Sequence, residues 1–179
     1  DGYKKLLERS LIACGDKELT HYEEAVERYQ DIFRECCMYR VEAYEGIGEL
    51  LEFLKSQGIF IAVLSNKPHP RTLDNVQGVF GKGYFDLVYG EQEDKGIKKK
   101  PCPDGVWAIA EELGLSKSEI LYLGDTNTDM ETGDNAKVDT VGVTWGFRTR
   151  EELMAFHPAL IADHPSQVVQ YIKDVNGIE

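Results

Sequence analysis

The stretch Ile120-Leu121-Tyr122-Leu123-Gly124-Asp125-Thr126-Asn127-Thr128-Asp129 decides the fold of this chain. Four apolar residues that end in Gly-Asp are typical of a buried central strand of a parallel sheet that runs into a loop. Open α/β sheets bind their ligands at the loops on this end of the strands. The stretch therefore predicts a parallel α/β sheet with Asp125 and Asp129 at its ligand-binding edge.

Two interpretations of the carboxylates of Asp125 and Asp129 follow from this position. Mg²⁺ takes only one or two protein carboxylates and completes its coordination with water and substrate phosphate, so two acidic side chains in one loop suit it. Alternatively, these side chains cap the helix that follows, because Asp is favoured near a helix N-terminus. The stretch taken alone leaves both interpretations open.

Composition and charge restrict the class of protein. The chain has 179 residues, of which 42% are hydrophobic, and this is enough for one buried core and a small accessory domain. The net charge is −12, from 32 acidic and 20 basic residues. This charge argues against a nucleic-acid or anionic membrane partner, since both attract basic surfaces.

The apolar runs and the cysteines indicate where the protein resides. The longest purely apolar run, residues 59–64, is far too short to cross a bilayer, and the N-terminus lacks the pattern of a signal peptide. Cys14, Cys36, Cys37 and Cys102 show neither CxxC spacing nor the density of a disulfide scaffold. We therefore expect a cytoplasmic protein without a zinc site.

Two kinds of periodicity divide the chain. Residues 1–43 are helical in pattern, with a capping box from Thr20 to Glu23 and apolar residues at i, i+3 and i+4 up to Cys36. Residues 44–179 alternate between helices and apolar strands, which is typical of a Rossmann-like parallel sheet. We predict a small all-helical domain before an α/β core whose strands are residues 59–64, 85–89, 120–123, 140–143 and 160–162.

Polar residues follow three of the predicted elements. Ser65-Asn66 comes after the first strand, Lys100-Pro101 precedes a helix that starts near Pro103, and Asp125 and Asp129 follow a later strand. Because the carboxyl ends of parallel strands share one crevice, we expect a hydroxyl, an ammonium and two carboxylates to converge there. This combination suits a phosphate group, with a metal ion that bridges it to the protein.

In these motifs the chain closely resembles the haloacid dehalogenase superfamily, and within it the phosphoglycolate phosphatase-like hydrolases with a helical cap. The motifs are Ser65-Asn66-Lys67-Pro68, Lys100-Pro101-Cys102-Pro103-Asp104 and Gly124 to Asp129, with 142–148 and 44–47 as flanking segments. Each motif is weak alone, but their order and spacing together make the resemblance specific. It covers nearly the whole chain and identifies residues 1–43 as a cap domain.

The resemblance implies Mg²⁺-dependent hydrolysis of a small phosphorylated metabolite, a phosphate monoester, through an aspartyl-phosphate. Ser65 would bind the transferring phosphoryl group, with Asn66 beside it. Lys100 would hold that group and the carboxylate of the nucleophile. Asp125 would be a direct Mg²⁺ ligand, and Asp129 a ligand or a holder of metal-bound water.

The chain departs from the superfamily in one respect. The first motif is a strand that ends in Asp-x-Asp and supplies the nucleophile, and no such strand precedes Ser65. The resemblance therefore places the nucleophile upstream of residue 1, and we expect a cap that is incomplete at its N-terminus and a core without its first, central strand. Strands beside that gap would have unpaired backbone groups, and the chain from Asp1 onward is expected to be inactive.

Two alternatives to a phosphatase stay open. A sugar-phosphate mutase of the same superfamily would keep the same core and differ in cap residues. A non-catalytic metal-binding or interaction module would have no need of the nucleophile. A dehalogenase is disfavoured, because chemistry without a metal has little use for both Asp125 and Asp129.

Overall fold

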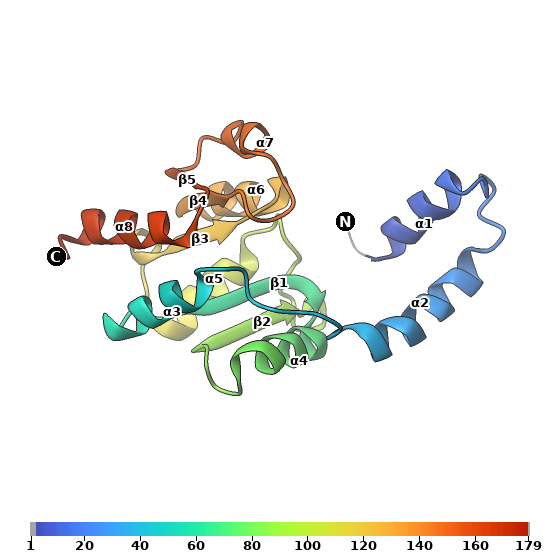
Figure 1. Ribbon diagram of the computed structural model, residues 1–179, viewed down its shortest axis with the longest axis horizontal. Coiled ribbons are helices and arrows are strands. Elements are labelled where there is room, and N and C mark those ends of the chain that lie inside the picture. Colours follow the sequence, from blue (N-terminus) through green and yellow to red (C-terminus); the bar gives the residue numbers. More distant parts are fainter. Residues whose placement is uncertain (1–2, 179) are drawn as a thin grey trace. The chain divides into compact units, whose positions relative to one another are not determined.

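The structure, a computed structural model, describes residues 3–178. The chain divides into two compact units, residues 1–42 and 43–179, each with its own internal contacts. Figure 1 shows the first unit as two helices and the second as parallel strands with helices around them. The role of the first unit as a cap stays a prediction.

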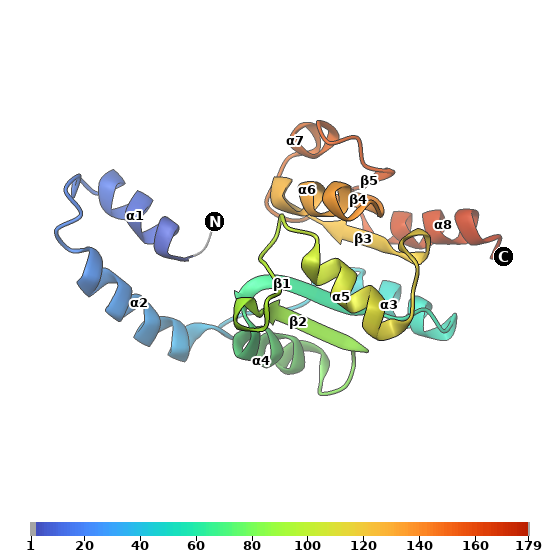
Figure 2. The same cartoon turned by 180° about the vertical axis from the view of Figure 1, so that it is seen from behind.

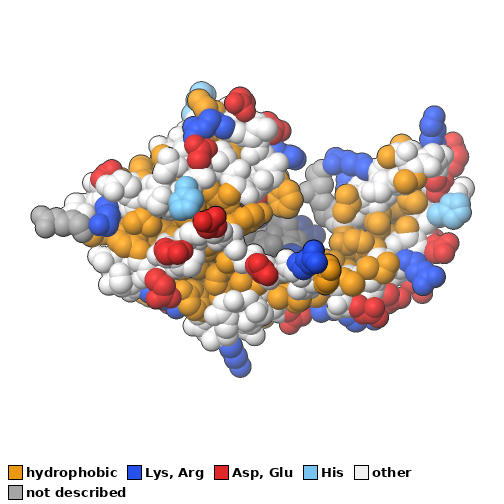
Figure 3. Space-filling model, viewed as in Figure 1, with side chains coloured by type: hydrophobic (Ala, Val, Ile, Leu, Met, Phe, Trp, Pro, Cys, Tyr) orange, Lys and Arg blue, Asp and Glu red, His pale blue; other side chains and the backbone are white. Residues whose placement is uncertain are grey.

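The first unit consists of α1 (Tyr3–Ala13) and α2 (Tyr22–Cys36). Tyr29 stacks on Tyr3 with ring centroids 5.1 Å apart and on Phe33 at 5.5 Å, so aromatic contacts join the two helices. None of the described residues of α1 and α2 is buried. Figure 3 accordingly shows hydrophobic side chains gathered on the surface of this unit.

The turn before α2 differs from the predicted capping box. No side chain caps the start of α2. Instead, the carboxylate of Asp16 accepts hydrogen bonds from the backbone N–H groups of Thr20 and His21, each at 2.9 Å. The Asp16 carboxylate therefore binds the Thr20 N–H, which Glu23 was predicted to bind in the capping box.

The second unit alternates between helices and strands, as predicted. Its elements in chain order are α3 (Ile47–Ser56), β1 (Ala62–Pro68), α4 (His69–Phe80), β2 (Leu87–Glu91), η1 (Glu93–Lys95), α5 (Asp104–Leu113), η2 (Lys117–Glu119), β3 (Leu121–Gly124), α6 (Asn127–Ala136), β4 (Asp139–Val143), α7 (Arg150–Met154), β5 (Leu160–Ala162) and α8 (Pro165–Asn176).

The first strand of this unit is shifted along the sequence relative to the prediction. It was expected at residues 59–64, but β1 begins at Ala62 and continues to Pro68. Just before β1, the Ile61 N–H donates to the Asp86 carboxylate at 2.8 Å, so a side chain and not a neighbouring strand binds this group. The polar residues Ser65-Asn66 thus belong to the strand itself.

The strands form two separate parallel sheets. One contains β1 and β2, and the other has the order β3-β4-β5. Within the described part of the chain, no strand pairs with the second side of β1 or of β3. The absence of a first, central strand from the core stays a prediction.

The core lies between the three-stranded sheet and two helices. A cluster of buried side chains from α3, β4, β5 and α8 joins these elements, namely Leu50, Val141, Val143, Ala162, Val168 and Ile172. Figure 1 shows α3 and α8 in front of the strands, and the reverse view of Figure 2 shows α5 and α6 in front. Helices thus cover both faces of the strands, as parallel sheets require.

Residues 3–178 contain no helix with the length and apolar character needed to cross a membrane. This finding agrees with the short apolar runs of the sequence.

The adjacent residues Leu153 and Met154 of α7 allow a test of the packing. Leu153 is 0% exposed and Met154 is 52% exposed. We expect Leu153→Ala to lower the free energy of unfolding by about 2–5 kcal/mol, because it leaves a cavity against the sheet. Met154→Ala should change it by less than about 0.5 kcal/mol. Denaturant titration of both variants measures the difference, and equal effects would contradict this packing.

Candidate functional site

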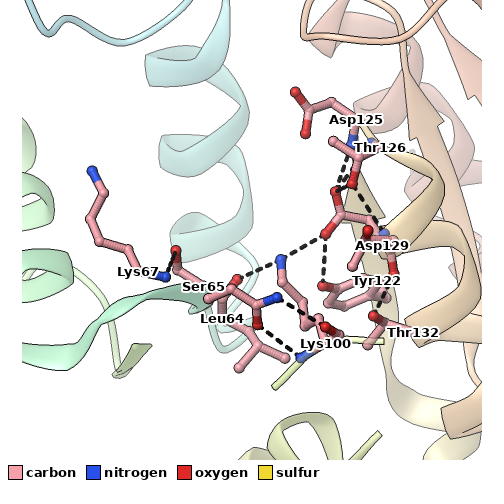
Figure 4. A network of polar contacts seen from close by, with 11 residues as sticks. Leu64, Ser65, Lys67, Lys100, Tyr122, Asp125, Thr126, Asp129 and Thr132 are labelled. Atoms are coloured by element: carbon pink, nitrogen blue, oxygen red, sulfur yellow. Dashed lines mark hydrogen bonds and ion pairs between the residues drawn. The ribbon is translucent and has the colours of Figure 1, made fainter. Parts of the chain in front are cut away.

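The predicted site residues lie at the carboxyl ends of β1 and β3. Ser65 and Asn66 stand near the end of β1, and Lys100 stands in the loop between β2 and α5. Asp125 directly follows β3, and Asp129 lies in the first turn of α6. Figure 4 shows that Lys100 and Asp129 meet beside the end of β1.

The ammonium group of Lys100 connects β1 with α6. Its Nζ donates to Asp129 Oδ1 at 2.7 Å, and to the backbone carbonyl of Leu64 on β1 at 3.2 Å. The side chains of Lys100 and Asp129 are only 14% and 8% exposed. Because water is largely excluded, this ion pair is much less screened than a surface pair.

Asp129 also organises the loop after β3. Its Oδ2 accepts from the Thr126 hydroxyl at 2.6 Å and from the backbone N–H groups of Thr126 and Asp125 at 3.1 and 3.3 Å. Its Oδ1 accepts from the Tyr122 hydroxyl at 3.3 Å. Thr126 and Asp129 form a capping box at the start of α6, so the helix-capping interpretation holds for Asp129.

These contacts lower the pKa of Asp129. Burial raises the pKa, but the charge and hydrogen bond of Lys100 and the bonds from Thr126 and the Asp125 N–H outweigh it, so the pKa lies below its usual value. Both carboxylate oxygens are thus engaged by groups of the chain. The prediction that Asp129 is a direct metal ligand stays a prediction, and holding metal-bound water is the role that suits its contacts better.

Asp125 has a different environment. Its Oδ2 accepts from the backbone N–H of Phe147 at 3.0 Å. A Cβ atom on Gly146 would lie 2.1 Å from the same oxygen, so only glycine allows this approach. The pKa of Asp125 is raised, chiefly by burial and also by the charge of Asp129, against the bond from Phe147. Asp125 lines an open pocket of about 280 Å³ together with Tyr44.

The end of β1 is irregular at the predicted phosphate-binding residues. The register between β1 and β2 shifts between Leu64 and Pro68, so Ser65, Asn66 and Lys67 are released from regular pairing. The Ser65 hydroxyl accepts from the Lys67 backbone N–H at 3.1 Å. A hydroxyl that accepts in this way still has its own proton to donate to a phosphate oxygen.

Asn66 does not point freely into the crevice. Its side-chain nitrogen donates to the Lys100 carbonyl at 2.9 Å, and its side-chain oxygen accepts from the Lys100 N–H at 2.8 Å. The substrate-binding role that the resemblance gave to Asn66 stays a prediction, but both ends of its amide are used by Lys100.

The donors at the end of β3 fit a hard cation such as Mg²⁺. The carboxylate of Asp125 accepts one described hydrogen bond, which leaves capacity on its oxygens. The side-chain oxygen of Asn127 is buried and has no hydrogen-bond partner among the described residues. Residues 3–178 contain no group of three or more His, Cys, Asp or Glu side chains that could enclose a metal. Mg²⁺ takes one or two protein carboxylates and keeps water and substrate oxygens as its other ligands, so the carboxylate of Asp125 is a suitable ligand for it.

Sequence reasoning missed four contributors to this site. Thr126 could have been found, because its three-residue spacing to Asp129 is that of a capping box. Tyr122 was hidden in the apolar run, where its hydroxyl has no pattern of its own. Gly146 and Phe147 were quoted only as part of a flanking segment, and their contact with Asp125 depends on the fold.

The geometry agrees with comparison to known proteins. The haloacid dehalogenase-like hydrolase family matches residues 3–143, and the chain belongs to this family. Its parallel α/β sheet and the order of its motifs are therefore those of a haloacid dehalogenase-like hydrolase.

Several relatives are described as phosphoglycolate phosphatases. The protein from Aquifex aeolicus (strain VF5) is 33% identical over 169 residues, which are 94% of this chain and 74% of that protein. The protein from Pectobacterium atrosepticum is 28% identical over 173 residues, which are 96% of this chain and 73% of that protein.

A solved structure shows the same fold. The crystal structure of a protein from Lactobacillus delbrueckii subsp. bulgaricus, assigned as a phosphoglycolate phosphatase, is 29% identical, with a TM-score of 0.79. The match covers 86% of this chain and 63% of that one. The chain therefore spans less than two thirds of this structural relative.

Gly146 provides a test of the close approach to Asp125. We expect Gly146→Ala to lower the free energy of unfolding by about 1–3 kcal/mol, because the new Cβ displaces the Asp125 carboxylate. Gly48→Ala is a matched control, since its Cβ meets nothing within 4 Å in helix α3, and it should stabilise by about 0.5–1 kcal/mol. Denaturant titration of both variants measures these free energies, and an unchanged free energy of unfolding in Gly146→Ala would disprove the contact.

Loss of the ammonium group tests the ion pair between Lys100 and Asp129. We expect Lys100→Met to lower the free energy of unfolding by about 3–5 kcal/mol at pH 7, because it leaves the buried Asp129 carboxylate without its cationic partner.

The effect of Lys100→Met should depend on pH. The folded-state pKa of Asp129 lies below its unfolded value, so the stabilisation is complete above that unfolded value and is lost as pH falls through the folded one. Unfolding titrations at pH 7 and below about pH 4 measure it. The difference between wild type and variant should shrink at the lower pH, and a constant difference would contradict the assignment.

Proposed function

We propose that this chain supplies the phosphate-binding lysine and the metal-binding carboxylate of a Mg²⁺-dependent phosphatase. The substrate is a small-molecule phosphate monoester of the phosphoglycolate class. One observation carries the proposal: the ammonium of Lys100 is fixed between Leu64 on β1 and Asp129 on α6, and Asp129 lies in the same loop-helix segment as Asp125. The phosphatases among the relatives support it.

The positive charge of Lys100 reduces the repulsion between the nucleophile and the phosphate group. An anionic nucleophile must approach an anionic phosphate, and unit charges about 4 Å apart repel by about 4 kcal/mol in a partly dry site. Lys100 is oriented by Asp129 and Leu64 before any substrate arrives, so no reorganisation is needed as charge develops on the phosphoryl oxygens. The Ser65 hydroxyl donates to one of these oxygens.

Asp125 would be a direct ligand of Mg²⁺, and Asp129 would be a second ligand or would hold metal-bound water. The ion would neutralise phosphate charge and polarise the phosphoryl group when bound. Phe147 and Gly146 fix the Asp125 carboxylate through the backbone, so the carboxylate is positioned without a second side chain. Asp129 holds Lys100 and orders the backbone of this loop.

The nucleophile in this proposal is an aspartate upstream of residue 1. Its carboxylate oxygen forms a bond to phosphorus as the ester P–O bond breaks, and the departing oxygen takes a proton from a neighbouring acid. Water then hydrolyses the aspartyl-phosphate and releases inorganic phosphate. A strand that carries this residue would add to the sides of β1 and β3 that pair with no other strand within residues 3–178.

Two further assignments belong to the same proposal. The helical unit of residues 1–42 acts as the cap that covers the substrate. The protein works in the cytoplasm, which is supported by the spacing of Cys14, Cys36, Cys37 and Cys102, because this spacing is not that of a disulfide scaffold.

The activity test uses the product of the complete gene. We expect hydrolysis of p-nitrophenyl phosphate in the presence of Mg²⁺ and loss of this activity in EDTA. Asp125→Asn should lower kcat/KM at least about 100-fold, because it weakens the metal site. Asp134→Asn, an exposed residue at the other end of α6, is the matched control and should leave the rate unchanged.

The outcomes separate the alternatives. Hydrolysis that is indifferent to EDTA would exclude the proposed mechanism. Transfer of phosphate back to a sugar phosphate, with no release to water, would identify a mutase. Absence of both reactions, with Mg²⁺ binding retained, would leave the non-catalytic metal-binding module. The chain from residue 1 onward is expected to bind Mg²⁺ more weakly than the complete gene product, as titration calorimetry measures.

A further inference from the structure

Strand β1 and helix α6 both hold the loop that carries Lys100, at the tip of the lysine side chain and at the backbone. At the tip of the side chain, Nζ is bound by Leu64 from β1 and by Asp129 from α6. At the backbone, Asn66 from β1 binds Lys100, and Asn135 from α6 donates to the Pro101 carbonyl at 2.9 Å. Figure 4 shows the side chain of Lys100 between Leu64 and Asp129.

The contact of Asn66 has the geometry of a backbone pair. Its amide nitrogen and oxygen engage the C=O and N–H of the same residue, at 2.9 and 2.8 Å. A side-chain amide carries the same donor and acceptor as a peptide group, so this pair fixes both the position and the orientation of the Lys100 backbone. Asn66 therefore replaces the strand neighbour that this part of the loop lacks.

A fixed backbone matters because the lysine side chain is flexible. Its four-carbon stem has several rotatable bonds, so the ammonium keeps one position when contacts hold both the backbone and the tip of the side chain. Leu64 and Asn66 are two residues apart on β1 and hold the two ends of Lys100. The irregular register after Leu64 frees Asn66 for this contact.

We propose that Asn66 is a positioning residue, whose amide places the Lys100 ammonium by clamping the Lys100 backbone and does not itself contact the phosphate. Asn135 supports the same loop from α6 with one bond. The kinetic consequence rests on the proposed function of Lys100, but the clamp itself does not depend on it.

The first experiment observes Lys100 directly in the chain of residues 1–179. In protein labelled with ¹³C-lysine, the two Hε protons of Lys100 should have distinct shifts, because the side chain is immobilised. The signal is assigned by its loss in Lys100→Arg. Asn66→Ala should merge these two shifts, and Asn135→Ala should bring them closer.

Asn176→Ala is the matched control for this experiment. The Asn176 side chain also donates to a backbone carbonyl, that of Ile172 at 2.8 Å, but it lies at the end of α8. The control should leave the Lys100 signal unchanged. An unchanged signal in Asn66→Ala would overturn the proposal.

The second experiment measures kinetics in the complete gene product. We expect Asn66→Ala to lower kcat at least about tenfold, with KM changed by less than about twofold, because a small misplacement of a catalytic group is costly. A lower kcat with an unchanged Lys100 signal would mean that Asn66 contacts the substrate, which overturns the proposal. A merged signal with unchanged kcat would confirm the clamp and count against the catalytic role of Lys100 instead.

Discussion

The buried ion pair between Lys100 and Asp129 is the interaction on which the site depends. The chain has two parallel sheets that share no strand pairing among the described residues, and the Lys100 ammonium reaches from the carbonyl of Leu64 to the carboxylate on α6. A buried pair often adds little net stability, because desolvation offsets the attraction between the charges. Its value here is geometric, since it sets where the cation stands relative to Asp125. The fold, the loop and the electrostatics of the site are therefore linked through one side chain.

The surroundings of the two carboxylates after β3 shift their pKa values in opposite directions. Asp129 is paired with a cation and accepts from the Thr126 hydroxyl and N–H, which lowers its pKa. Asp125 is half-buried near another negative charge, which raises its pKa and makes a cation a favourable partner. Environments that separate two similar groups in this way are common where the groups have different tasks. The close packing of Gly146 on Asp125 contributes to this difference, because it fixes the Asp125 carboxylate without neutralising its charge.

Sequence reasoning found the α/β fold and brought the right segments to one edge of the sheet, because both depend on local periodicity and on the direction of parallel strands. It placed the end of β1 wrongly, because strand ends depend on partners, and the Asp86 side chain takes the place of a strand neighbour at Ile61. It also could not see the clamp of Asn66 on Lys100, which joins residues 34 positions apart. At the start of α2, the predicted capping box of Thr20 and Glu23 was wrong, because the Thr20 N–H donates to the carboxylate of Asp16 instead. The contacts that the sequence did not predict are thus hydrogen bonds between side chains and backbone groups, which have no period in the sequence.

The division of the strands into two sheets has a consequence for cooperativity. A two-stranded sheet is marginal by itself, whereas three strands with a packed face can persist. The β1-β2 pair is therefore the weaker partner, and the β3-β4-β5 layer with α3 and α8 forms the stronger unfolding unit. Protein segments open locally with their own free energies. In this chain the half of the candidate site on β1, with Ser65 and Asn66, would open before the half that follows β3, with Asp125 and Asp129, so the two halves of the candidate site differ in their lifetimes.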